Sequence, residues 1–326
     1  MFGQTTPHGL FLRWTGASVR QMTARDTVTF YLHPELRKRA ERGSHNFIGM
    51  LTEVLADAGL AVAFDGDDDL ARLRAATRPG RAMFLMDEPV NARGLTMRKT
   101  YIYPFWHIEK HAKRWEWPVA TDTFHPATQD AQKSANFYRF WQKRLFQEAP
   151  QDAREDGFVY VPLQGHLLRQ RSFQTCSPIE MIKTVLAREP KRQIVVTLHP
   201  SETYSPSEQD ALEELQLQHE LLFIRSGGTD RYLQNCDYIV TQNSSVGFMG
   251  YFFGKPLILF GKADFHHIAL NVHDFGVGAA FDAVHQHQPD YAAYLHWFLQ
   301  QRAINAGRPD IKTKIRTVLR NHDWPV

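Results

Sequence analysis

The sequence predicts an α/β protein of two domains, with a doubly wound sheet in its C-terminal half. The chain has 326 residues, roughly twice a typical domain of about 150 residues. From Gly157 onward, short β-branched or aromatic runs alternate with helical stretches, as expected for parallel strands joined by crossover helices. A polar stretch at 147–156 separates this half from a less regular N-terminal half, so we expect the linker there.

The C-terminal half contains five expected strands, at 158–163, 193–198, 220–225, 238–241 and 256–260. A helix is expected over 178–188, because its apolar residues recur on one face. Another is expected over 206–217, where Ser205 precedes the first helical residue as an N-cap. Five strands with intervening helices make one doubly wound unit.

The N-terminal half predicts a second, smaller α/β unit. Strands are expected at 27–32, 61–64 and 82–86, with helices at 46–58 and 69–76 between them. An aromatic-rich helix is expected over 129–146, and closing helices over 291–303 and 311–319. These patterns divide the chain into residues 1–150, 151–290 and 291–326.

Composition and charge narrow the class of protein. Hydrophobic residues make up 43% and charged residues 22%, which is ordinary globular usage and argues against long disordered segments. The formal charge of +3 is too small to predict nucleic-acid binding.

Cysteine usage and hydropathy indicate the compartment. Two isolated cysteines, Cys176 and Cys236, suit a reducing compartment. The first residues, MFGQTTPHGLFLRW, lack the apolar core of a signal peptide, and no stretch reaches roughly 18 apolar residues. We therefore expect a cytoplasmic protein, with peripheral association at the inner face of the cytoplasmic membrane still open.

Polar residues gather at the ends of two expected strands. His199 and Pro200 follow the strand at 193–198, and Asn243, Ser244 and Ser245 follow the strand at 238–241. Open α/β sheets bind ligands at the carboxyl ends of their strands. The two serines also precede an apolar helical run, and a helix start favours an anion. The alternative is that Asn243 or Ser244 only caps that helix.

Four segments carry a resemblance to a known family. They are VYVPLQ (159–164), VVTLHP (195–200), CDYIVTQNSSVG (236–247) and GKPLILFG (254–261). In this order they resemble the bacterial capsule polysaccharide biosynthesis family, which includes transferases that add Kdo from CMP-Kdo. HP followed by SS is also similar to the donor-binding motifs of bacterial sialyltransferases. The resemblance implies two facing Rossmann-like domains of the GT-B type with a cleft between them.

The resemblance also implies roles for the domains and residues. Residues 151–290 would bind the nucleotide sugar and residues 1–150 would face the acceptor. His199 and Pro200 would meet the cytidine phosphate, and Ser244 and Ser245 would hold its oxygens. The donor-binding candidates are Gln164, His199, Pro200, Asn243, Ser244 and Ser245.

The chemistry of sugar transfer is consistent with these residue types. A sugar phosphate leaves as an anion while the anomeric carbon gains positive character, so donors fixed in advance must stabilise the departing charge. His199 is also a candidate general acid, although a lone histidine at a strand end is more often a structural hydrogen-bond partner.

A base or nucleophile is expected from the facing domain, because the acceptor hydroxyl lies on the other side of the sugar. Asp87 and Glu88 follow an apolar strand and precede Pro89, which places two acids at an expected cleft edge. Glu109 is the other candidate. Adjacent carboxylates are usually solvated turn residues, which is the alternative interpretation.

The segment FWHIEKHAKRWEW at 105–117 interleaves aromatic and basic residues. Aromatic rings stack on sugar faces while cations meet acidic groups, so we expect an acceptor-binding surface with His107, Lys110 and Arg114. The alternative is an amphipathic helix whose cations extend to solvent.

The sequence as a whole predicts a metal-independent glycosyltransferase. It would move a sugar from a nucleotide donor, best a CMP-activated 2-keto acid sugar such as Kdo, to a capsule polysaccharide or glycolipid acceptor. The rivals are a sugar-nucleotide epimerase and a non-catalytic glycan-binding assembly subunit. No cofactor is expected, because the paired histidines at 266–267 and 285–287 lack further ligands at zinc spacing, and the acidic run at 65–69 lacks the glutamate that closes an EF-hand loop.

Overall fold

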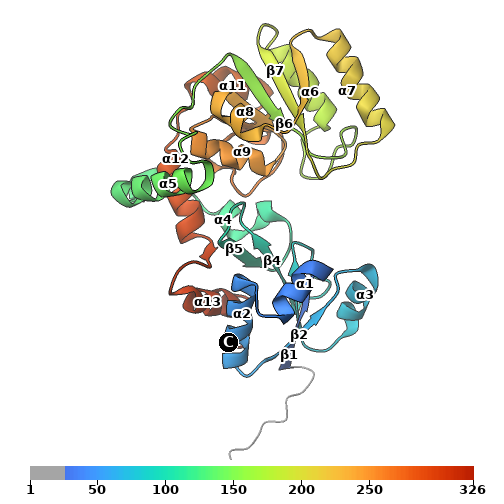
Figure 1. Cartoon of the computed structure of the whole chain (residues 1–326), viewed down its shortest axis with the longest axis vertical. Coiled ribbons are helices and arrows are strands. Elements are labelled where there is room, and N and C mark those ends of the chain that lie inside the picture. The colour runs from blue at the N-terminus through green and yellow to red at the C-terminus, as the bar shows by residue number, and fades with distance from the viewer. Residues whose placement is uncertain (1–25) are drawn as a thin grey trace, which may run out of the picture.

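The computed structural model describes residues 26–326 and contains two α/β units that meet at a shared interface (Figure 1). Each unit is built around a six-stranded sheet. The segment MFGQTTPHGLFLRW lies outside the described residues, and so does the expectation that rests on it. Over residues 26–326, every helix is too short or too polar to span a bilayer.

The C-terminal sheet is fully parallel, with the strand order β11-β10-β9-β6-β7-β8. The strands are β6 (Phe158–Pro162), β7 (Gln193–Leu198), β8 (Leu222–Ser226), β9 (Tyr238–Thr241), β10 (Leu257–Leu259) and β11 (Leu270–Asn271). Numbered from β6, this order is 3-2-1-4-5-6, the order of doubly wound dinucleotide-binding sheets. The winding direction reverses between β6 and β9, and such a switch point is where these sheets bind ligands.

Helices cover both faces of this sheet. They are α6 (Pro178–Arg188), α7 (Pro206–Gln218), α8 (Thr229–Asn235), α9 (Ser245–Gly250), α10 (Val272–Phe275) and α11 (Val277–Ala283). The apolar face of α6 buries Ile182 and Val185 in one core with Val159 and Val196 of the sheet. At the start of α7, the Ser205 side chain and Glu208 form a capping box, which satisfies N–H groups that the helix leaves free.

The N-terminal sheet has the order β12-β5-β4-β3-β1-β2. Its strands are β1 (Thr27–Tyr31), β2 (Ala61–Asp65), β3 (Arg81–Leu85), β4 (Gly94–Lys99), β5 (Phe105–Glu109) and β12 (Ile304–Asn305). Strands β1 to β4 are parallel, whereas β5 and β12 are antiparallel to their neighbours. The helices of this unit are α1 (Pro34–Glu41), α2 (Asn46–Asp57) and α3 (Asp69–Thr77).

The chain crosses between the units twice. Helix α5 (Ala131–Phe146) leads to the C-terminal unit and packs against α12 (Tyr291–Leu295), which leads back (Figure 1). The π-helical turn His296–Gln301 follows α12, β12 then pairs with β5, and α13 (Ile311–Asn321) packs on α2. The last residues of the chain therefore complete the N-terminal sheet and its core.

The strands and helices predicted for the C-terminal half are present, with β7, β9 and α6 at the expected residues. The segment at 105–117 forms strand β5 and the short 3-10 helix Arg114–Glu116. The alternative of an amphipathic helix is therefore wrong. Its aromatic residues are mostly buried, Trp106 and Trp117 among them.

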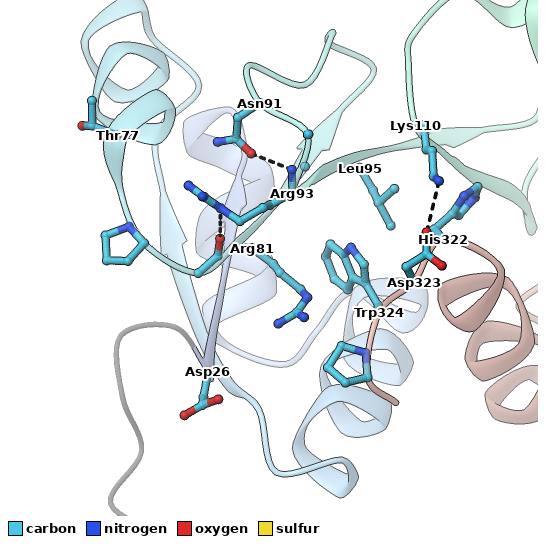
Figure 2. A pocket seen from close by; sticks show the side chains of 15 residues that line it. Asp26, Thr77, Arg81, Asn91, Arg93, Leu95, Lys110, His322, Asp323 and Trp324 are labelled. Carbon is cyan, nitrogen blue, oxygen red and sulfur yellow. Dashed lines mark hydrogen bonds and ion pairs between the residues drawn. The ribbon is translucent and has the colours of Figure 1, made fainter.

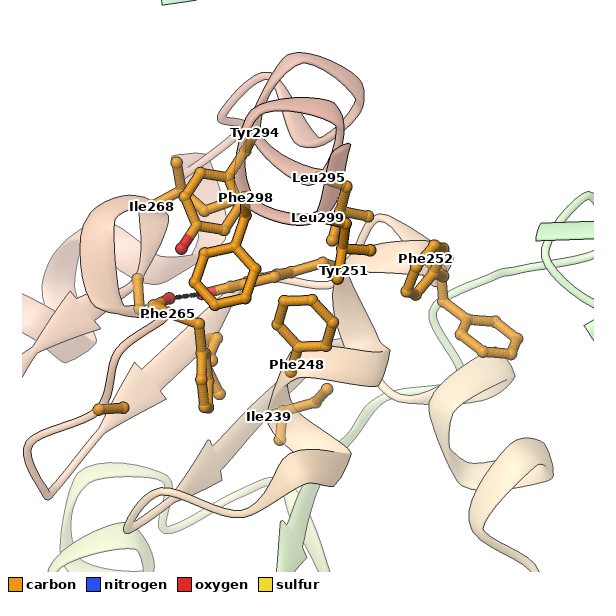
Figure 3. Close-up of a cluster of buried hydrophobic side chains, with 14 of the residues drawn as sticks. Ile239, Phe248, Tyr251, Phe252, Phe265, Ile268, Tyr294, Leu295, Phe298 and Leu299 are labelled. Atoms are coloured by element: carbon orange, nitrogen blue, oxygen red, sulfur yellow. Dashed lines mark hydrogen bonds between the residues drawn. The ribbon is translucent and has the colours of Figure 1, made fainter. Parts of the chain in front are cut away.

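An aromatic core joins α9 to the closing helices (Figure 3). Phe248, Tyr251 and Phe252 come from α9 and the turn after it, and they meet Tyr294 and Phe298. The Tyr251 hydroxyl donates a 3.0 Å hydrogen bond to the carbonyl of Phe265. Helix α9, which begins at the candidate serines, is thus packed in one core with α12 and the turn after it.

We expect Phe298→Ala to lower the free energy of unfolding by about 3–5 kcal/mol, because it removes a ring buried in this core. Phe140→Ala is the matched control, since that ring is 58% exposed and surface substitutions usually change stability by less than about 0.5 kcal/mol. Urea titrations of both variants test the difference. Equal shifts would contradict a central role for this cluster.

Candidate functional site

The expected donor-binding residues lie at one edge of the C-terminal sheet. Gln164 follows β6, His199 and Pro200 follow β7, and Asn243 follows β9. In the order β9-β6-β7, the loop after β6 lies between the other two. Neighbouring strands are about 4.8 Å apart, so the loops after β7 and β9 start about 10 Å from each other. These loops therefore lie at the switch point, where the winding direction of the sheet reverses between β6 and β9.

The loop after β9 has one capping serine and one free serine. The buried Ser244 accepts a 3.3 Å hydrogen bond from the Val246 N–H and is the N-cap of α9. The side-chain amide of Asn243 donates to the Lys262 carbonyl at 3.2 Å. The Ser245 side chain is exposed. The capping alternative therefore describes Ser244, and Ser245 has its hydroxyl available to a ligand.

The His199 ring has a defined hydrogen-bonding partner. Its Nδ1 accepts from the Ser201 N–H at 3.2 Å, and its own backbone N–H donates to the Tyr204 hydroxyl at 2.8 Å. When the ring is neutral, Nδ1 is thus the acceptor and Nε2 carries the proton. His199 and Pro200 are exposed. The imidazole can therefore donate from Nε2 to an oxyanion without losing an internal contact.

Four side chains at this edge have buried polar atoms with no protein partner within residues 26–326: Gln164, Arg171, Gln174 and Gln242. Unsatisfied buried polar atoms are rare in folded proteins. These four belong to the loops that follow β6 and β9. Sequence reasoning singled out only Gln164, because isolated Arg and Gln residues in a loop form no pattern.

A cavity of about 310 Å³ lies between the two units. Trp115 and Glu116 line it from the N-terminal unit, and Lys262, His266 and His273 line it from the C-terminal unit. These last three follow β10 and β11, so the cavity opens at the same carboxyl edge as the donor loops. His266 Nδ1 lies 2.8 Å from the Ala263 carbonyl, which fixes its ring.

A buried charged network joins the units next to this cavity. Arg114 pairs with Asp264 at 3.3 Å, and their side chains are only 11% and 1% exposed. The Tyr101 hydroxyl donates to Asp264 and accepts from Arg114, and burial holds the pKa of Tyr101 well above its usual value. Arg114, expected to bind the acceptor, is instead enclosed by these partners, so we remove it from the acceptor surface.

The other expected acceptor residues are also not grouped on a surface. Trp106 and Trp117 are only 4% and 1% exposed, and His107 is buried with them. Burial lowers the pKa of His107 to about 4, so its ring is neutral at physiological pH. Lys110 is exposed and pairs with Asp323 at 3.4 Å. The aromatic rings of this segment therefore stabilise the sheet rather than present an open face.

The three candidate carboxylates occupy different places. Asp87 and Glu88 follow β3 at the carboxyl edge of the N-terminal sheet. Asp87 pairs with Arg72 at 3.2 Å, and Glu88 accepts a 2.7 Å hydrogen bond from the Ala112 N–H. That bond ties the Glu88 loop to the segment that carries Arg114 into the interface.

Glu109 lies further back along the sheet, where it pairs in register with Thr96 in the middle of β4. Burial raises its pKa to about 7. The imidazoles of His107 and His322 lie 3.9 and 3.7 Å from its carboxylate. Glu109 is thus an enclosed carboxyl group behind the cleft edge.

A wider cavity of about 900 Å³ lies at the opposite edge of the N-terminal sheet (Figure 2). Asp26, Arg81 and Gly94, at the amino ends of three strands, contribute to its lining. Parallel sheets bind ligands at the other edge. Within residues 26–326, no group of three His, Cys, Asp or Glu side chains could hold a metal ion.

The fold and site define a GT-B-like α/β protein with two mainly parallel, Rossmann-like domains. The chain belongs to the capsule polysaccharide biosynthesis protein family, whose signature matches residues 121–308. The predicted family and fold class are confirmed.

The chain is also similar to several solved structures. The β-Kdo 2,7 transferase of Thermosulfurimonas dismutans KpsC is 12% identical with a TM-score of 0.49, over 83% of this chain and 88% of that one. The β-Kdo 2,4 transferase of the same KpsC is 12% identical with a TM-score of 0.46, over 83% and 89%. UDP-GlcNAc 2-epimerase from Neisseria meningitidis, bound to UDP-GlcNAc, is 10% identical with a TM-score of 0.37, over 90% and 99%. No curated protein matches the chain.

Glu109→Gln should stabilise the protein at pH 8 but not at pH 4.5. The pKa of Glu109 rises from 4.5 to about 7 on burial, so the folded state binds more protons than the unfolded state between these values. Stability then falls as pH rises through this window, by about 3 kcal/mol in total. Thermal unfolding at both pH values, with the exposed Glu213→Gln as control, measures the effect. A pH-independent shift would show that Glu109 is not held protonated by burial.

Proposed function

We propose that the chain is a GT-B glycosyltransferase that moves a CMP-activated 2-keto acid sugar, such as Kdo, to a capsule or surface-glycan acceptor. The observation that carries the proposal is the convergence of three polar loops, after β6, β7 and β9, at the switch point of a 3-2-1-4-5-6 sheet. Membership of the capsule polysaccharide biosynthesis family supports the sugar chemistry. In this proposal residues 151–290 hold the donor and residues 1–150 face the acceptor.

The leaving phosphate would lie between the loops of His199 and Ser245. His199 Nε2 and the Ser245 hydroxyl would supply donors from the two loops. Such preorganised donors stabilise charge that develops in the transition state. His199, once protonated, would also give its proton to the departing phosphate oxygen. Gln164 would contact the nucleotide from the loop between them.

The acceptor would approach from the N-terminal unit. Asp87 and Glu88 lie at the carboxyl edge of that sheet, and we propose one of them as the base that takes the proton of the acceptor hydroxyl. The acceptor is a growing polysaccharide or glycolipid, and the protein would work at the inner face of the cytoplasmic membrane. Lys110 pairs with Asp323 and lines the cavity at the opposite edge of the N-terminal sheet, so it is not part of this approach.

CMP should stabilise the protein more than UMP, GMP or ADP does. A ligand at 100 times its dissociation constant that binds only the folded state stabilises it by about 2.7 kcal/mol. A thermal-shift series over these nucleotides measures the preference. If UMP gives the largest shift, the donor class is wrong. Epimerisation of a UDP-sugar with no acceptor present would contradict the transferase proposal itself.

His199→Ala should lower the rate of CMP release from CMP-Kdo by about 100-fold or more, the usual contribution of a general acid. The control is His219→Ala, because His219 is exposed at the end of α7, away from the proposed site. Release is measured with acceptor glycan present, alongside CMP affinity. An unchanged rate would remove His199 from the reaction.

Glu88→Gln should keep CMP binding but lose sugar transfer. That result would exclude a non-catalytic assembly subunit.

A further inference from the structure

The loop between β6 and α6 crosses the ends of β9 and β10. Gln174 forms a β-bridge with Gly261, and the Thr175 N–H donates to the Phe260 carbonyl at 2.8 Å. The Lys262 N–H donates to the Phe173 carbonyl at 2.8 Å. A Cβ on Gly261 would lie 2.9 Å from the Gln242 carbonyl oxygen, so the loops after β9 and β10 approach too closely for a side chain there. The crossing loop is therefore fixed over the switch point.

Arg171 occupies this loop with an unusual set of contacts. Its backbone N–H donates to Gln174 Oε1 at 2.7 Å, and its guanidinium stands 4.8 Å from the centre of the Phe173 ring. Two guanidinium nitrogens, Nε and one terminal nitrogen, are buried without a protein partner in the described chain, and so is Nε2 of the buried Gln174. Glu202 offsets part of the Arg171 charge, but leaving charged donors buried without a hydrogen bond is costly. These donors suit an oxyanion bound at the crossing loop.

Lys262 brings a second positive charge to the loop that pairs with the crossing loop. Its backbone joins the crossing loop to the serine loop, because it donates to Phe173 and accepts from Asn243. Its side chain lines the cavity between the units together with Trp115. The Trp115 ring lies 5.4 Å from the Phe173 ring, and Arg171 stands over that same ring. The N-terminal unit therefore contacts the loop at the ring that supports Arg171.

We propose that Arg171 and Lys262 form a cationic clamp for the phosphate of the nucleotide donor, beside the cavity that Trp115 lines from the other unit. The inference rests on the proposed function, because it takes the ligand to be a nucleotide sugar. Of the donors already assigned, the Ser245 hydroxyl carries no charge, whereas the phosphate is an anion. A guanidinium meets phosphate oxygens in a bidentate fashion and an ammonium meets them as a point charge, so the two are complementary.

The test compares CMP with cytidine, which lacks the phosphate, by calorimetric titration of the full chain. Arg171→Met and Lys262→Met should each weaken CMP binding at least about tenfold while cytidine binding stays unchanged. Arg171→Lys should recover part of the loss. The matched control is Arg225→Met, because Arg225 also stands over a ring two residues away but lies at the end of the edge strand β8.

Four outcomes would overturn the clamp. Equal weakening of CMP and cytidine would give Arg171 a structural role, and unchanged CMP binding would exclude a contact. A loss confined to CMP-Kdo, with CMP binding retained, would assign the cations to the sugar carboxylate. If the wild type prefers another nucleotide, the proposed donor fails while the clamp is tested with that nucleotide and its nucleoside. If it binds no nucleoside monophosphate, both proposals fail.

Discussion

The buried pair of Arg114 and Asp264, shared with the Tyr101 hydroxyl, holds the two units in one relative position. Buried charges are tolerated only when their partners are in place, so sliding one unit along the other would expose an uncompensated charge. Asp264 and Lys262 both lie in the loop between β10 and β11. Tyr101 also stacks on Phe248 of α9 at 4.4 Å, just after the candidate serines. The anchor between the units is therefore built into the loops of the proposed site.

The Arg114–Asp264 pair also fixes the position of neighbouring residues in the N-terminal unit. Arg114 follows Ala112 by two residues, and Ala112 holds the Glu88 carboxylate through its backbone N–H. Trp115 follows Arg114 and lines the cavity with Lys262. Catalytic groups must keep their geometry within a fraction of an ångström. A single ion pair thus fixes the segment that holds the Glu88 carboxylate and the ring of Trp115 that lines the cavity.

The sequence predicted the C-terminal unit well because its local signals agree with its tertiary role. Strand β7 is a near-continuous apolar run, as a strand buried on both faces requires, and α6 shows a helical period. Strand β5 was harder to predict, because four successive residues, 105–108, are buried while the basic residues that follow them suggest a surface. Strand β12 has two residues and pairs with a strand about 200 positions earlier in the chain, so no local pattern marks it.

The site was predictable to the extent that its residues occur in motifs. His199 and Ser244 became candidates because HP and SS stand at strand ends. Arg171 and Lys262 are isolated cations, and only the crossing of the loop over β9 and β10 brings them together.

The return of the chain through β12 and α13 makes the N-terminal unit discontinuous in sequence. A ribosome would release the whole C-terminal unit before it releases the segment that finishes the first sheet. Until then β5 presents an open edge, which in other proteins invites pairing with foreign strands. Assembly of the N-terminal unit thus requires β12 and α13, and cutting the chain at the linker would yield an unfinished half rather than an independent domain.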